Sequence, residues 1–139
     1  MNARRAYALI YLATVLSLGH HLDHAIRGNH IGWPLSAEVT SFTYSLGVYP
    51  LILLGLFLSR AGKAGAGYWA WLFGIGVVFL TAVHFGPTAI EPPHDIIDLH
   101  QPPLLGWLAF AELLVLLAAL VASFAYQMRL WLRDRPRPS

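Results

Sequence analysis

The segment "AYALIYLATVLSLGHHLDHAIRGNH" (residues 6–30) contains the two features that decide how the chain is interpreted. Its first half, from Ala6 to Leu18, is almost entirely apolar, and its second half collects four histidines, an aspartate and an arginine. An apolar run of about 20 residues crosses the hydrocarbon core of a bilayer as a helix. The segment therefore predicts a membrane-spanning helix whose far end gathers titratable groups.

The composition of the whole chain supports a membrane protein. Of its 139 residues, 57% are hydrophobic and only 12% are charged, whereas about 25% are charged in a typical soluble domain. Four apolar segments follow one another, at about 6–26, 37–59, 67–86 and 104–128. We therefore predict an all-α fold, a single membrane domain over 1–139 that forms a bundle of four transmembrane helices. The absence of cysteine excludes disulfides and thiolate metal ligands.

The basic residues predict the orientation of the chain. Except for Arg27, every lysine and arginine lies before the first apolar segment, between the second and third, or in the tail 129–139. The positive-inside rule places these positions, and hence both termini, in the cytoplasm. The seven histidines then lie on the outer, periplasmic side of a cell (inner) membrane. The basic residues are thus explained by topology, so we expect the lipid bilayer, and not nucleic acid, as the partner.

Two similar strings suggest an internal repeat. "GWPLSAEV" (32–39) and "GWLAFAEL" (106–113) share Gly, Trp, Ala and Glu at the same offsets, and each precedes or opens an apolar segment that runs inward. We predict two helical hairpins, over about 6–59 and 67–128, related by a pseudo-twofold axis. This repeat would pair His20 with His84, and Glu38 with Glu112.

The histidines predict a metal site. His20 and His24 are four residues apart, so they share one face of a helix, and neutral imidazoles at this spacing can bind one ion. Asp23 is a carboxylate companion of the usual kind, and His84 ends an otherwise apolar segment, where an ionisable group is costly and indicates function. The alternative is an amphipathic helix end, with Asp23 paired to Arg27 and the histidines among lipid headgroups.

Two glutamates are candidate catalytic groups. Glu112, within "AFAELLVLL", is predicted to be the most buried carboxylate of the chain, and it needs a partner or a proton-transfer role there. Glu38 is shallower, and Ser41 and Ser45 continue its face of the helix. We predict that Glu112 and Glu38 act as acid–base groups beside the histidines.

The outer loop "PTAIEPPHDIIDLHQPP" (87–103) adds further candidate metal ligands. Two Pro-Pro pairs stiffen the ends of its central part, which we expect to form a short helix. His94, Asp98 and His100 are the residues of this loop that could complete a metal site. The loop is predicted to be a lid or a ligand-bearing cap, and the alternative is a solvated connection.

Four classes of function are compatible with these features. The first is a membrane metalloenzyme, an oxidoreductase or hydrolase that uses iron, copper or zinc on a lipophilic or small apolar substrate. The second is a b-type haem electron-transfer subunit that binds haem between His20 or His24 and His84. The third is a metal-free acid–base isomerase or cyclase, and the fourth is a small structural subunit of an oligomer or larger membrane complex. The chain has no HExxH, P-loop, GxGxxG or GxSxG motif.

Overall fold

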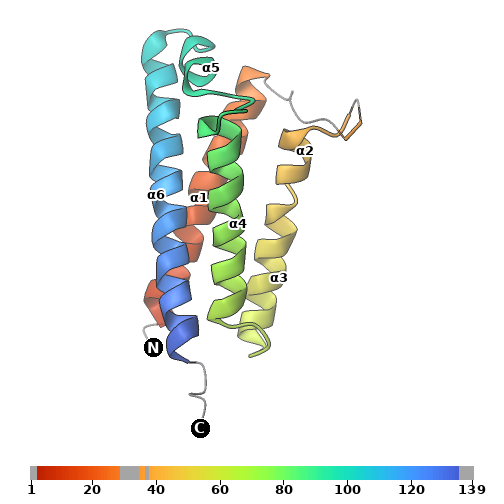
Figure 1. Cartoon of the computed structure of the whole chain (residues 1–139), viewed down its shortest axis with the longest axis vertical. Helices are drawn as coiled ribbons and strands as arrows, with labels where there is room; N and C mark the ends of the chain where they lie inside the picture. Colours follow the sequence, from red (N-terminus) through yellow and green to blue (C-terminus); the bar gives the residue numbers. More distant parts are fainter. Residues whose placement is uncertain (1–2, 29–34, 37, 135–139) are drawn as a thin grey trace.

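The fold is known from a computed structural model, which describes residues 3–28, 35–36 and 38–134. Every regular element in this part of the chain is a helix, and the long helices run alongside one another (Figure 1). The start of α1 and the end of α6 lie at the same end of the molecule. The elements are α1 (Ala3–Arg27), α2 (Ser41–Ser45), α3 (Val48–Arg60), α4 (Ala66–Phe85), α5 (Pro93–Asp98) and α6 (Pro103–Arg133).

Three helical segments of the described chain are long and apolar enough to cross a membrane: Ser41–Arg60, which comprises α2 and α3, then α4, and then α6. The 20 residues of α4 reach about 30 Å, the thickness of a bilayer's hydrocarbon core. The chain is thus an all-helical protein of the membrane type. α1 covers the predicted span 6–26 but is not among the three, because its last two turns carry histidines and charged groups. A fourth span therefore stays a prediction.

The second span differs from the single helix predicted over 37–59. α2 ends at Ser45 and α3 begins at Val48. Pro50 explains the break, because it has no N–H to donate to the carbonyl of Leu46 and its ring crowds that carbonyl. The described helix also begins only at Ser41, and residue 37 lies outside the described residues. The later spans agree more closely with the prediction, although α6 continues past 128 to Arg133.

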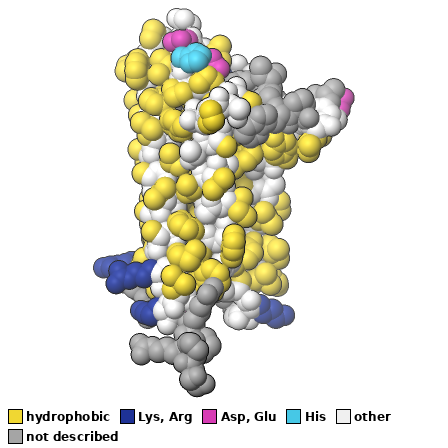
Figure 2. Space-filling model, in the orientation of Figure 1, with side chains coloured by type: hydrophobic (Ala, Val, Ile, Leu, Met, Phe, Trp, Pro, Cys, Tyr) yellow, Lys and Arg dark blue, Asp and Glu magenta, His cyan; other side chains and the backbone are white. Residues whose placement is uncertain are grey.

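The surface agrees with a position in a membrane. Large apolar side chains are exposed on the sides of the long helices, including Val15 on α1 (67%), Phe57 on α3 (68%) and Val78 on α4 (70%). Figure 2 shows hydrophobic side chains over most of the face in view, with lysine and arginine gathered where α1 begins and α6 ends. Acidic and histidine side chains lie at the opposite end. We call these the basic end and the histidine end.

One buried cluster of side chains lies toward the basic end. Ile10 of α1 and Trp69 and Phe73 of α4 form a buried cluster there. α3 joins it through Gly55, where a Cβ atom would lie 2.9 Å from the ring of Trp69. The turn after α3 is closed by Gly62, whose φ of 69° suits glycine. Since only a glycine permits this approach, Gly55 fixes α3 against α4.

At the histidine end, α5 packs against the beginning of α6. Ile96 of α5 is 1% exposed and shares a buried cluster with Leu113 and Leu116 of α6. Gly106 lies directly against the backbone of Ile97. The short helix predicted in the loop 87–103 is therefore present, and it is anchored rather than extended into solvent.

The structure does not support the predicted repeat. The first inward segment is broken into α2 and α3, whereas its counterpart α6 is continuous. Glu38 precedes α2, while Glu112 lies inside α6, so the two glutamates are not at equivalent places. Part of the first copy of the repeated string, residues 32–34 and 37, lies outside the described residues.

Candidate metal centre

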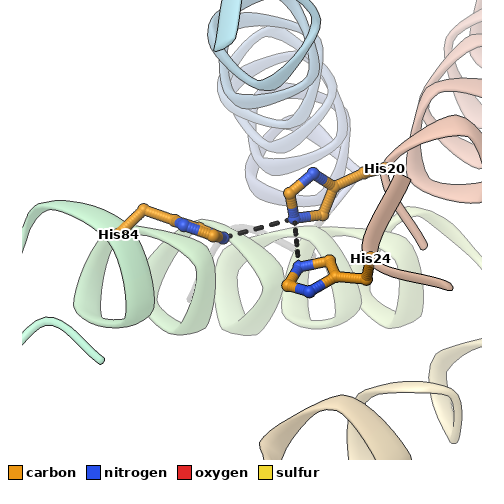
Figure 3. A group of neighbouring side chains, drawn as sticks. All are labelled: His20, His24 and His84. Atoms are coloured by element: carbon orange, nitrogen blue, oxygen red, sulfur yellow. Dashed lines mark hydrogen bonds between the residues drawn. The ribbon is translucent and has the colours of Figure 1, made fainter. Parts of the chain in front are cut away.

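Three histidines from two helices converge at the histidine end. His20 and His24 lie one turn apart on α1, and His84 lies in the last turn of α4 (Figure 3). The Nε2 atom of His20 is 3.2 Å from Nε2 of His84 and 3.2 Å from Nε2 of His24. One ring nitrogen of each residue lies within 4.8 Å of the other two. We call these residues the histidine triad.

The spacing of the triad suits a metal ion. Nitrogens bound tetrahedrally at about 2.0–2.1 Å from one ion lie about 3.3 Å from each other, close to the two separations of 3.2 Å. His20 and His84 are 5% and 1% exposed, so their rings are held by packing. The same spacing also suits N–H···N hydrogen bonds between neutral imidazoles. The triad could therefore hold a metal ion, and the metal-free alternative is an N–H···N hydrogen bond between Nε2 of His20 and one of its two neighbours.

The orientation of His84 is set by the loop that follows α4. Its Nδ1–H donates to the backbone carbonyl of Glu91 at 2.9 Å. The loop is folded back because the amides of Ile90 and Glu91 both donate to the carbonyl of Val83, at 3.1 and 3.2 Å. With the proton of His84 on Nδ1, the lone pair of its Nε2 faces Nε2 of His20. Metal-binding histidines usually have such a partner on the second nitrogen.

Glu91 also contacts the triad through its side chain, which is 4% exposed. Its Oε2 lies 3.2 Å from Nε2 of His24, and its Oε1 accepts a hydrogen bond of 2.5 Å from Nη1 of Arg27. Arg27, whose side chain is 1% exposed, donates from Nε to Asp23 at 2.7 Å. Arg27 thus pairs with two carboxylates, and Glu91 brings one of them next to His24 of the triad.

Glu112 lies behind His20. Its Oε2 is 3.8 Å from Nδ1 of His20, which is longer than a hydrogen bond. Gly19 makes room for it, since a Cβ atom at that position would lie 3.4 Å from Oε1 of Glu112. The side chain of Glu112 is 28% exposed, so the prediction that it is the most buried carboxylate is wrong. Glu91 is the more buried of the two.

The predicted ligands of the outer loop lie apart from the triad. His100 links α5 to α1, because its Nε2 lies 2.8 Å from Oδ1 of Asp23 and its Nδ1 donates to the carbonyl of Ile96. The side chain of His94 is 70% exposed and pairs with Asp95, and Asp98 is exposed at the end of α5. The three-residue group that could hold a metal in the described chain contains none of Asp23, His94, Asp98 and His100.

His21, the neighbour of His20, and Glu38, a residue of the predicted site, have other surroundings. His21 ties α1 to the next helices: its ring nitrogens lie 2.9 Å from Oγ of Ser45 and 2.9 Å from the hydroxyl of Tyr49. Glu38 is exposed and accepts a hydrogen bond from Ser36. The structure therefore does not bring Glu38 to Glu112. His30, the last histidine of the first cluster, lies outside the described residues.

A cavity of about 350 Å³ adjoins the triad, a volume typical of small-molecule sites. All three triad residues and His21 line it, together with Ser41 and Ser45 and a larger number of apolar side chains from α1, α3, α4 and α6. Asp, Glu, Lys and Arg are absent from its described lining. A ligand of the triad on the cavity side would thus lie in an apolar chamber.

Comparisons of the chain with known protein families, with curated proteins and with solved structures found no match. The interpretation of the site therefore depends on its geometry. The geometry describes an all-helical membrane-type protein with a buried cluster of three histidines beside an apolar cavity.

Sequence reasoning did not assign Glu91 to the site. It contacts His84 through its backbone and His24 through its side chain. Its position depends on how the loop after α4 folds back, which no periodic pattern reveals. The available signal was its place seven residues after His84 and immediately before the first Pro-Pro pair.

Proposed function

We propose that this protein is a metal-dependent membrane enzyme that acts on an apolar substrate. The observation that carries the proposal is the convergence of three imidazoles from α1 and α4 on the wall of an apolar cavity. Three protein ligands leave a coordination position open, which is typical of catalytic rather than structural metal sites. On the cavity side, that position is available to water or to substrate.

The chemistry follows from the donor atoms. Imidazole nitrogen suits iron, copper and zinc, and the chain has no cysteine to favour softer metals. Iron or copper would supply redox chemistry at the site, and zinc would activate water for hydrolysis. The triad would hold the ion, and the backbone carbonyl of Glu91 orients the ring of His84.

The geometry favours a single ion over haem. Two axial histidines of a haem lie on opposite sides of the iron, with nitrogens about 4 Å apart. The Nε2 atoms of His20 and His84 are 3.2 Å apart, and His24 converges on the same point from the same helix as His20. The convergence of three rings supports an ion as the ligand of the triad.

The orientation in the membrane is part of the proposal. The basic residues at one end of the molecule support a cytoplasmic location for both termini. The triad then lies in the outer half of a cell (inner) membrane and faces the periplasm. A tag-accessibility assay on the C-terminus tests this topology, and a periplasmic C-terminus would contradict it.

Metal analysis of the purified protein tests the proposed function. We expect one equivalent of iron, copper or zinc in the natural chain, and loss of most of it in His84→Ala. His94→Ala is the matched control, because the side chain of His94 is 70% exposed and pairs with Asp95 away from the triad. A visible spectrum with a Soret band would select haem instead. Folded protein that binds no metal would leave the triad as a hydrogen-bonded structural cluster.

A further inference from the structure

The cavity beside the triad is open on one side. Leu51 of α3 and Ile75 of α4 line it, and they are 46% and 61% exposed. The lining residues Ala13 of α1 and Leu116 of α6 are both 2% exposed. The opening therefore lies between α3 and α4, and the walls on the side of α1 and α6 are closed there.

Two contacts bound this opening along the helices. Toward the histidine end, Tyr44 of α2 meets Phe79 of α4 with ring centroids 6.0 Å apart. Toward the basic end, Gly55 of α3 lies against the rings of Tyr68 and Trp69, and the hydroxyl of Tyr68 donates to the backbone carbonyl of Leu51. α3 is thus held to α4 near the basic end, α2 meets α4 near the histidine end, and the gap lies between the two contacts.

The opening lies at the depth of the bilayer core. Ile75 is midway along α4, and Leu51 is midway along the span Ser41–Arg60. Each is therefore about 15 Å from the ends of its span, near the centre of a hydrocarbon layer about 30 Å thick. A molecule that passes through this gap comes from the lipid phase and not from water.

The lining selects the chemistry of such a molecule. The polar groups of the wall gather near the triad, while Leu51, Ile75 and their neighbours toward the basic end are apolar. When no metal ion is bound at the triad, the described lining has no acidic or basic side chain besides histidine, so an ionised group would have no opposite charge to pair with, at a large cost in free energy. From Ile75 to His84 the distance along α4 is about 13 Å, which suits a chain rather than a compact molecule.

We propose that the gap between α3 and α4 is a lateral portal for an uncharged, single-chain lipid with one oxygen-bearing end. The lipid enters from the bilayer at Leu51 and Ile75 and directs its oxygen toward the histidine triad. The inference rests on the proposed function for the reaction at the oxygen. Binding of the lipid in the cavity does not require that reaction.

Photolabelling of the full chain in liposomes tests the portal. The probe is a dodecanol that carries a diazirine in its chain, and labelled residues are found by peptide mass spectrometry. We expect label on cavity residues such as Phe79 that excess plain dodecanol removes, because cavity binding saturates and contact with bulk lipid does not. Dodecanoate with the same diazirine, at a pH where it is ionised and with the protein freed of metal by a chelator, should label these residues much less.

A pair of tryptophan variants locates the route. Ile75→Trp fills the opening and should lower the saturable label by about tenfold or more. Val78→Trp is the matched control, since Val78 lies on α4, is 70% exposed and does not line the cavity. Equal labelling in the two variants, or label that dodecanol does not displace, would overturn the portal. Labelling by dodecanoate as strong as by dodecanol would overturn the uncharged class.

The photolabelling tests the portal separately from the metal site. If His84→Ala has lost its metal and still shows saturable label, both proposals stand. Saturable label in a natural chain that binds no metal would support the portal and contradict the proposed metal-dependent enzyme. Bound metal without saturable label would support the metal site and contradict the portal.

Discussion

The two ends of the contact between α3 and α4 differ in a way that separates stability from function. Near the basic end, Gly55 lets the helices touch through Trp69. Toward the histidine end, the same helices carry Leu51 and Ile75, and the space between them is part of the cavity. A glycine permits close approach and larger side chains keep helices apart. The tight half fixes the arrangement, and the open half provides room for a ligand.

The charged groups of the two ends differ as well. At the basic end Arg133 and Asp134 form an ion pair with side chains 61% and 55% exposed, and such pairs contribute little to stability. At the histidine end Arg27 and Glu91 are 1% and 4% exposed and pair beside the triad. Removing one partner of a buried ion pair strongly destabilises the folded protein, because the other charge is left buried and unpaired. Substitutions of charged residues should therefore lower the stability much more at the histidine end than at the basic end.

The largest effect is expected for His20→Ala. His20 is the residue whose Nε2 lies 3.2 Å from the nitrogens of both other triad members. Its loss should weaken metal binding by more than about 100-fold, since a ligand is removed and not merely the partner of one. Isothermal titration with zinc in a chelator-buffered solution measures this. An affinity within a few-fold of the natural chain would show that the ion is bound elsewhere.

Glu91→Gln should weaken metal binding by about 10–100-fold, the usual effect of losing a group that orients a ligand. The substitution keeps the backbone bond to His84 but removes the charge that faces His24 and Arg27. Asp95→Asn is the control, because its carboxylate is 41% exposed and pairs with His94 on α5. Equal affinities for the two variants would mean that the side chain of Glu91 does not act on the triad.

A smaller effect, on stability and not on metal binding, is expected where α3 and α4 touch near the basic end. Gly55→Ala places a methyl group against Tyr68 and Trp69, and it should lower the free energy of unfolding by about 1–3 kcal/mol. Gly65, the N-cap of α4, would meet no atom within 4 Å as alanine, so Gly65→Ala loses only the N-cap preference for glycine and should lower the free energy of unfolding by less than about 1 kcal/mol. Thermal unfolding in micelles compares them. A Gly55→Ala variant as stable as Gly65→Ala would contradict the close contact.

The smallest effect should be a gain in stability. Gln127 of α6 is 2% exposed, and its Nε2 has no hydrogen-bond partner. Gln127→Leu removes an unsatisfied buried group, so the free energy of unfolding should rise by about 1 kcal/mol. Metal binding should not change, because Gln127 is far along α6 from Glu112 and lies toward the basic end. A clear loss of stability would indicate that this amide has a partner.

Much of the helical architecture could be predicted because long apolar runs dictate it. The segments 67–86 and 104–128 are continuous helices in the structure. The break between Ser45 and Val48 was predictable in principle from Pro50, but apolar length alone conceals it. Residues on regular helices were likewise easier to assign: His20 and His24 share a face at spacing four, and the same spacing pairs Asp23 with Arg27.

The rest of the site depends on contacts that no local pattern encodes. Glu91 reaches the triad because a loop folds back on Val83, and His100 reaches Asp23 because α5 packs on α6. Glu38 was expected beside Glu112 from a similarity of two short strings, yet it is exposed before α2. Spacing within a helix predicts a shared face, whereas contacts between loops and helices require the packed structure.

X-ray absorption fine structure at the edge of the bound metal tests the central claim most directly. We expect three imidazole ligands of the metal in the natural chain, at about 2.0–2.1 Å if the ion is zinc. We expect fewer imidazoles around any metal that His24→Ala retains, and an unchanged spectrum in His94→Ala. A spectrum of the natural chain without imidazole scattering, or one that is the same in His24→Ala, would contradict a metal centre at His20, His24 and His84.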